Sequence, residues 1–114
     1  MELRQLISNI KSRQGLLNDD LKSLQSELEM TYERNALESG VIDRGYFTSF
    51  NMVLERYRQM RKISQFMVSE EEYVDNGRLV KIPVVDITSG FDNKRLFILP
   101  KSVIRDLNID NLLN

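Results

Sequence analysis

Two side chains that carry much of protein chemistry are missing from this sequence, which contains no cysteine and no histidine. Without cysteine, the chain can form neither a disulfide nor a zinc site with thiolate ligands. Without histidine, it lacks the side chain that most often serves as a general base or a metal ligand. The sequence also shows no glycine-rich phosphate loop, nucleophile elbow or paired-carboxylate constellation. We therefore expect a protein that is not an enzyme and that has no cofactor and no metal site.

Strong net charge and long apolar runs are missing as well. The 114 residues carry a net charge of −1, whereas a nucleic-acid-binding domain is normally clearly basic. No stretch approaches the roughly 18 apolar residues of a membrane-spanning helix, and the N-terminus does not resemble a secretion signal. These features predict a cytoplasmic protein with one folded unit and no membrane or small-molecule partner.

The first third of the chain contains apolar residues spaced alternately four and three apart, which is the heptad pattern of a coiled coil. The positions are Leu3, Ile7, Ile10, Leu17, Leu21, Leu24 and Leu28, with Gln14 in the one gap. Because the series keeps its phase across Gly15, the pattern predicts a single helix over residues 2–38. Gly40 would end this helix, since glycine readily adopts the left-handed conformation at a helix end.

A second series with the same spacing follows Asp43, whose carboxylate can cap a helix. Its positions are Tyr46, Phe50, Val53, Tyr57, Met60, Ser64 and Met67. The pattern predicts a second helix over residues 43–68. If the chain reverses near Gly40, the two helices form an antiparallel coiled coil in which Glu27 lies beside Arg56. The predicted apolar contacts are Leu28–Val53, Leu24–Tyr57, Leu21–Met60 and Leu17–Ser64.

Beyond residue 68 the pattern changes to that of a β-sheet. Asp75-Asn76-Gly77 is typical of a type I′ turn and predicts a hairpin between residues 71–74 and 78–82. Pro83 cannot donate a hydrogen bond to a ladder, so it should interrupt or end a strand at an edge or a bend.

Two further strands are expected over residues 84–88 and 95–99, followed by a short helix that begins at Pro100. The predicted fold class is therefore α+β. An N-terminal antiparallel coiled-coil hairpin (residues 1–68) is followed by a small antiparallel β-sheet and a short C-terminal helix (residues 69–114).

The N-terminal turns of the first helix carry apolar residues without a counterpart in the second. These residues are Leu3, Leu6, Ile7 and Ile10. In the predicted register they face polar residues 71–78, so either the sheet or another chain must cover them. This surplus favours a self-associating protein-interaction module that acts as an adaptor, inhibitor or assembly factor with an unidentified protein partner. A short chain of this kind is compatible with a viral or mobile-element accessory protein.

Two sets of basic residues support an alternative, a small regulator that binds nucleic acid through local patches. The sets are Arg56, Arg58, Arg61 and Lys62 on the second helix, and Lys94, Arg95 and Lys101 near the C-terminus. The other interpretation of the first set is a solvated helix flank, on which arginine stems cover apolar residues.

Residues 96–109 are similar to the strand–proline–short-helix segment of AbrB-type DNA-binding domains. The matching stretch contains Pro100 between the apolar strand residues and a short helical pattern. The resemblance implies that Lys94, Arg95 and Lys101 contact phosphate. The first strand and the glycine-containing turn of that family have no counterpart here. We therefore interpret the match as a shared order of strand, proline and helix, not as membership of the family.

Overall fold

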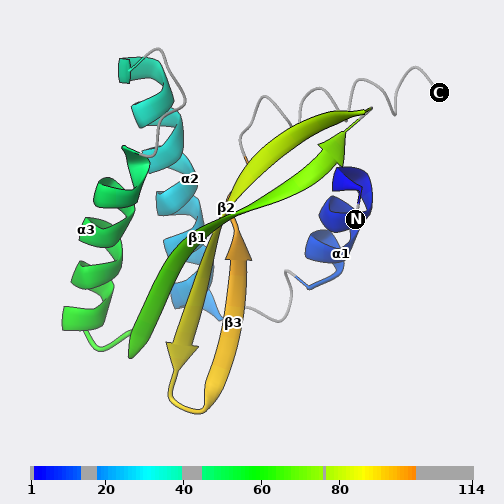
Figure 1. The fold of residues 1–114 in the computed structure, drawn as a ribbon. Helices are drawn as coiled ribbons and strands as arrows, with labels where there is room; N and C mark the ends of the chain where they lie inside the picture. Colours follow the sequence, from blue (N-terminus) through cyan, green and yellow to red (C-terminus); the bar gives the residue numbers. More distant parts are fainter. Residues whose placement is uncertain (1, 14–17, 40–44, 76, 100–114) are drawn as a thin grey trace.

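The computed structural model of this protein describes residues 2–13, 18–39, 45–75 and 77–99, with the backbone alone for 10–13 and 36–39. Within these residues, three helices are followed by a three-stranded antiparallel sheet (Figure 1). The elements are α1 (Leu3–Arg13), α2 (Asp19–Ser39), α3 (Tyr46–Gln59), β1 (Gln65–Asp75), β2 (Arg78–Ser89) and β3 (Asp92–Phe97). The fold is α+β, but the predicted arrangement is wrong. No helix follows the strands in the described chain, and the helix expected from Pro100 lies outside it.

The predicted single helix over residues 2–38 is wrong, because α1 and α2 are separate elements on different sides of the sheet (Figure 1). The α2 helix has its own N-cap, since the Asn18 side-chain oxygen accepts a hydrogen bond from the Leu21 backbone N–H at 2.8 Å. Asp19 and Asp20 lie in the first turn, where the helix dipole favours negative charge. The heptad spacing therefore continues across two helices that pack in different places.

The predicted second helix over residues 43–68 is also wrong, because α3 ends well before residue 68. Arg61 adopts a left-handed conformation with a φ of 60°. The Arg61 N–H donates to the Arg58 carbonyl and the Lys62 N–H to the Tyr57 carbonyl, both at 3.0 Å. This is the hydrogen-bond pattern of a Schellman C-cap, in which the left-handed position is usually glycine. The chain then enters β1 as an extended strand.

The α2 and α3 helices pack antiparallel, as predicted. Tyr32 and Tyr46 lie near one end of the pair, with ring centroids 5.1 Å apart. Glu27 and Arg56 form an ion pair farther along, which confirms the predicted neighbours.

The apolar interface between these helices differs in part from the predicted one. Leu24 and Tyr57 are buried in one cluster, but Leu54 takes the fully buried position expected for Val53, which is only partly buried. Met60 lies beyond the end of α3 and is 48% exposed, so the expected Leu21–Met60 core pair does not form. Both helices also pack on the sheet, which changes the face that each one buries.

The predicted first β-hairpin is confirmed. Asp75 pairs with Arg78 around a two-residue turn in which Gly77 has a φ of 78°. The strands are longer than predicted, because β2 contains both of the segments expected on either side of Pro83. A second tight turn connects β2 to β3, where Ser89 pairs with Asp92.

Pro83 lies inside the central strand, where it is buried and pairs with Glu70 of β1, so the predicted interruption is wrong. Its carbonyl accepts a hydrogen bond from the Ile98 N–H at 2.9 Å, just after β3 ends. The β3 ladder covers β2 only from Val84 onward. Pro83 therefore stands where β2 becomes an edge on its β3 side, the kind of position at which proline is tolerated.

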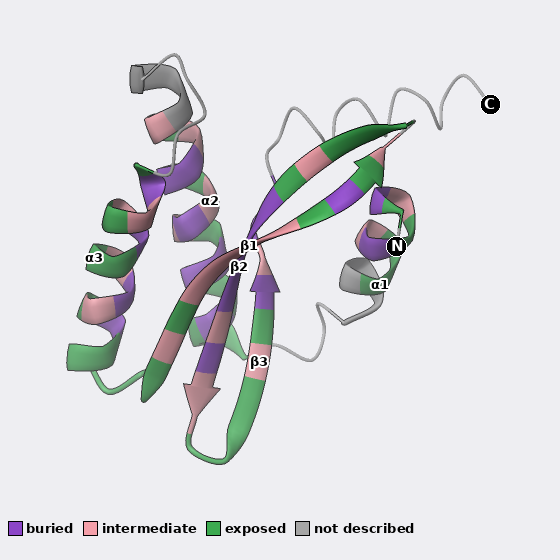
Figure 2. Ribbon diagram, in the orientation of Figure 1, coloured by how far each residue is buried: buried purple, intermediate pink, exposed green. Residues whose placement is uncertain are grey.

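The sheet carries helices on both of its faces (Figure 2). Because side chains alternate along a strand, the register places Phe66, Ile87 and Val85 on one face, against α2 and α3. The opposite face carries the smaller cluster, in which α1 packs on the far part of the β1–β2 hairpin. This cluster contains Leu3, Leu6, Tyr73, Ile82 and Leu99.

Candidate functional site

Three of the four N-terminal apolar residues pack against the chain's own sheet. Leu3 and Leu6 are buried against the sheet, with exposed fractions of 0% and 4%, and Ile7 packs at the margin of the same cluster. The side chain of Ile10 lies outside the described residues. Of the apolar surplus that suggested a dimer interface, Leu3, Leu6 and Ile7 therefore pack within one chain.

The basic residues in and just after α3 are largely neutralised by acidic neighbours. The ion pairs are Arg56–Glu27, Arg58–Glu55 and Lys62–Asp20. The Lys62 ammonium also lies 5.6 Å from the centre of the Tyr57 ring. Arg61 is exposed at the helix cap. Carboxylates therefore lie among the cations of this set, and phosphate binding by these residues stays a prediction.

The second basic set is divided between the two faces of the sheet. Lys94 and Arg95 are consecutive in β3, so their side chains point to opposite faces. Lys101 lies outside the described residues. The sequence had grouped all three as phosphate contacts, but the strand geometry separates Lys94 from Arg95.

Arg95 belongs to a polar network that spans the three strands. Its Nε donates to Asp86 at 2.8 Å, and its Nη1 donates to Glu71 at 2.6 Å. The hydrogen bond with Asp86 raises the pKa of Arg95. The Tyr73 hydroxyl donates to the other oxygen of Glu71 at 2.6 Å, and burial together with this bond raises the pKa of Tyr73 to about 12. The network connects β1 to β3 across β2 and leaves Arg95 committed to carboxylates.

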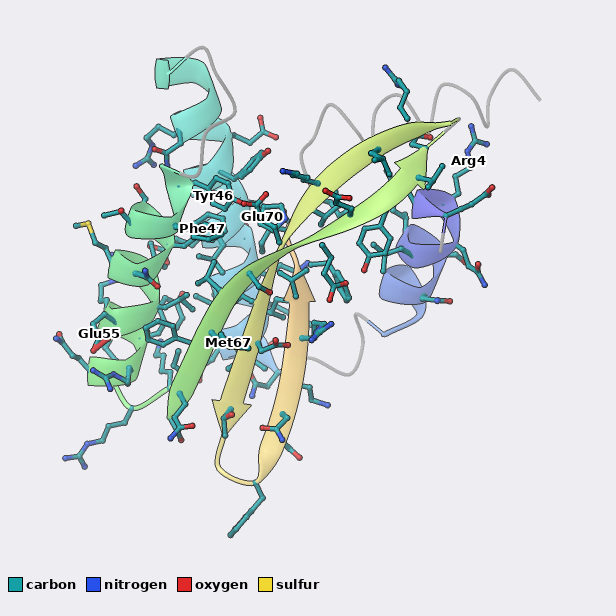
Figure 3. The ribbon with its side chains drawn as sticks, viewed as in Figure 1. Arg4, Tyr46, Phe47, Glu55, Met67 and Glu70 are labelled. Atoms are coloured by element: carbon teal, nitrogen blue, oxygen red, sulfur yellow. The ribbon has the colours of Figure 1, made fainter. Side chains whose placement is uncertain are left out.

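An open hollow of about 640 Å³ lies between α3 and the start of β1, and we call it the α3–β1 groove. Its lining residues are Thr48, Asn51, Met52, Glu55, Arg56, Gln59 and Phe66. Met52 is 71% exposed there, although it is a large apolar side chain. Figure 3 labels Glu55 on α3 and Met67 on β1, the two elements that border the groove. The lining charges Glu55 and Arg56 are each engaged in an ion pair.

The β1 strand is at the edge of the sheet, and its outer side borders this groove. Antiparallel pairs alternate between hydrogen-bonded and non-hydrogen-bonded. The Pro83 carbonyl accepts its hydrogen bond from the β3 side and therefore points away from β1. The pair between Pro83 and Glu70 of β1 is thus non-hydrogen-bonded. The alternation then directs the backbone N–H and C=O groups of Phe66, Val68, Glu70 and Glu72 outward, away from β2. Within the described chain, the strand contact on this outer side is a single bridge from Glu2 to Val74.

The outer edge of β3 is different, because α2 covers part of it. The same alternation directs the Phe97 carbonyl outward, where it accepts a hydrogen bond from the Gln25 side-chain amide at 3.4 Å. Gln25 is buried at 8% exposure. Gln25 thus contacts the end of the β3 edge, whereas the β1 edge borders the groove.

The sequence prediction missed this site because it placed Phe66 and Val68 in a helix. Apolar Phe66 and Val68 lie two residues apart and are flanked by polar Gln65 and Ser69, which is the period of a half-buried strand. That signal covers only a few residues, and the apolar Met67 between Phe66 and Val68 breaks the alternation of apolar and polar residues.

Comparisons with protein-family models, with curated proteins and with solved structures gave no match. In the described part of the chain, no helix has both the length and the apolar character needed to cross a bilayer. The site therefore has to be interpreted from its own geometry.

Proposed function

We propose that this protein is a non-catalytic protein-binding module and that the α3–β1 groove is its binding surface. The observation that carries the proposal is an open hollow, in which Met52 and Phe66 lie among polar residues, beside the edge strand β1. A role as adaptor, inhibitor or assembly factor would require such a surface.

The composition of the groove suits a protein partner. Cores of protein interfaces are depleted of free charge and enriched in methionine and aromatic residues. Met52 and Phe66 supply these side chains from two different elements. The charges of Glu55 and Arg56 are already compensated within the chain, so a partner covering them meets no isolated ion.

The proposal is tested by placing a photo-crosslinking amino acid at position 52 in cells that normally contain the protein. Position 91 is the matched control, because Phe91 is an exposed apolar residue in the turn between β2 and β3. We expect a discrete crosslinked protein from position 52 and none from position 91.

The captured protein must then bind in purified form. Met52→Glu should weaken its affinity by about tenfold or more, since it places a charge in an apolar contact. Phe91→Glu should leave the affinity unchanged. A purified partner that binds both variants as tightly as the unmodified protein would overturn the proposal.

A further inference from the structure

We infer that Met52 is a site of reversible oxidation, at which a peroxide converts the thioether to a sulfoxide and thereby turns off binding in the α3–β1 groove. This inference rests on the proposed function and adds the regulation of the same site. Methionine is flexible and apolar, whereas its sulfoxide is polar, so oxidation disrupts contacts that depend on methionine.

The methionines of the described chain lie on its surface. Methionine is among the residues most often fully buried in proteins. Here the buried apolar residues are leucine, isoleucine, valine, phenylalanine and tyrosine, whereas every methionine that the structure describes is between 48% and 71% exposed. These residues are Met30, Met52, Met60 and Met67. Oxidation in this part of the chain therefore changes the surface and places no polar group inside either apolar cluster.

Met52 combines the highest exposure of the four with a place in the groove lining. Thr48 and Arg56 lie four residues before and after it in α3, so the three side chains share one face of the helix. A peroxide reaches the Met52 sulfur from solvent on this face. The sequence contains no cysteine, so no thiol of the chain competes for the oxidant.

The oxidation needs a peroxide as its one co-reactant. The Met52 sulfur attacks one peroxide oxygen, the O–O bond breaks and an S–O bond forms. The second oxygen leaves as water, or as an alcohol when the oxidant is an organic hydroperoxide. Sulfur loses two electrons to the peroxide. Methionine sulfoxide reductases reverse the step with two electrons from an external thiol, and the sulfoxide oxygen leaves as water.

The new oxygen changes what the groove can bind. A sulfoxide oxygen is a hydrogen-bond acceptor, and a partner that packs an apolar group on Met52 would bury this oxygen without a donor. Such burial should weaken binding by about tenfold or more. A partner that is already bound covers the sulfur and should protect Met52 from the oxidant.

The first test uses hydrogen peroxide and the purified full chain. Peptide mass spectrometry quantifies the sulfoxide at each methionine over time. We expect Met52 to oxidise at nearly the rate of methionine in a short peptide, and a methionine sulfoxide reductase to restore it. Thermal unfolding of the oxidised chain, followed by circular dichroism, should shift by less than about 4 °C, because the apolar clusters are untouched.

The second test measures binding of the purified protein that is captured by crosslinking at position 52. The unmodified chain, Met52→Leu and Met67→Leu are each treated with peroxide, freed of it and titrated beside untreated samples. Leucine is close to methionine in volume and resists this oxidation. Met67 is the matched control, because it is 61% exposed but follows Phe66 in β1, so its side chain points to the other face of the sheet.

Peroxide should weaken binding by the unmodified chain and by Met67→Leu about tenfold, and it should not change the affinity of Met52→Leu from its untreated value. Met52→Gln, which is polar like the sulfoxide, should bind weakly without any peroxide. Addition of the captured protein before the peroxide should slow oxidation of Met52 but not of Met67.

Four outcomes would overturn the inference and leave the proposed function in place. Met52 stays reduced in the folded chain, oxidation unfolds the chain, the captured protein binds the oxidised and untreated chains equally, or peroxide weakens Met52→Leu as much as the unmodified chain. If no protein is captured at position 52, the proposed function fails, and the regulation inferred here fails with it.

Discussion

At the scale of single residues, Arg61 connects the helical and the sheet parts of the chain. A side chain in the left-handed conformation costs roughly 1–2 kcal/mol relative to right-handed backbone, because Cβ approaches the following carbonyl. The two hydrogen bonds of the C-cap hold Arg61 in this conformation and direct the chain from α3 toward β1. The groove between those two elements therefore depends on a residue that contributes nothing to its lining.

Replacing Arg61 by glycine should relieve this strain. Because Arg61→Gly also removes a charge near a helix C-terminus, Arg61→Ala is the appropriate reference. We expect the glycine variant to be more stable than the alanine variant by about 1 kcal/mol. Glycine avoids the left-handed strain in the folded state, and its greater conformational entropy in the unfolded state offsets part of that gain. Urea denaturation of both variants measures the difference. Equal stability, or a more stable alanine variant, would show that the left-handed conformation is not maintained in solution.

Tyr73 gives a residue-scale prediction about pH. Its pKa is raised to about 12 by burial and by the hydrogen bond to Glu71, whereas that of a free tyrosine is about 10. The folded state thus retains this proton more strongly than the unfolded state. The contribution of Tyr73 to stability is fully present below about pH 10 and is lost as the pH rises through about 12.

Tyr73→Phe should be less stable than the unmodified protein by about 1–2 kcal/mol near neutral pH, because Glu71 loses a hydrogen bond. The phenylalanine cannot ionise, so this deficit should shrink as the pH rises beyond about 10. Denaturant titrations of both proteins at a series of pH values measure the change. A deficit that stays constant up to about pH 12 would contradict the raised pKa.

At the scale of elements, the sequence predicted the antiparallel pairing of two helices and the hairpin at Gly77, because both depend on local signals. It did not predict the break between α1 and α2. A heptad series indicates which residues are apolar, but not which surface each one packs against. Leu6 packs against β-hairpin residues far along the chain, whereas Leu24 packs in the cluster with α3. The prediction also missed the groove, because it extended the second helix through β1. The α3 helix ends at a left-handed position that is usually glycine, but this position is occupied by Arg61.

The Asn18 cap is the local signal that marks the start of α2. Asn18→Ala removes the acceptor for the Leu21 N–H and should destabilise the protein by about 1 kcal/mol. Asn18→Asp keeps an acceptor oxygen at the cap and adds a charge that the helix dipole favours, so it should be at least as stable as the unmodified protein. Thermal unfolding followed by circular dichroism compares the three proteins. An alanine variant as stable as the aspartate variant would mean that α2 does not begin at this cap.

At the scale of the whole molecule, one sheet supports two apolar clusters of unequal size on opposite faces. The larger joins α2 and α3 to the sheet, and the smaller joins α1 to the outer part of the β1–β2 hairpin. The two clusters share β2, in which Val85 belongs to the first and Ile82 to the second. The α3–β1 groove is built on the larger cluster, so the groove should persist even when α1 is released.

This asymmetry predicts that α1 opens before the molecule unfolds. The helix has 11 residues, and isolated helices shorter than about 12–15 residues are marginal in water. Among its described side chains, Leu3 and Leu6 are the ones buried against the sheet, and its release need not disturb the larger cluster. Native-state hydrogen exchange should show opening of α1 at a lower free energy than opening of α3, because local units exchange independently of global unfolding.

Two matched substitutions of buried leucine test this order of opening. Leu6→Ala should speed amide exchange in α1 and leave α3 nearly unchanged, because the loss is limited to the free energy of docking α1. Leu54→Ala, in the larger cluster, should cost about 2–5 kcal/mol of global stability and speed exchange of the slowest amides throughout α2, α3 and the sheet. If Leu6→Ala instead speeds exchange in α3 as much as in α1, the two clusters unfold as one unit. The groove would then depend on the N-terminal helix that lies on the opposite face of the sheet.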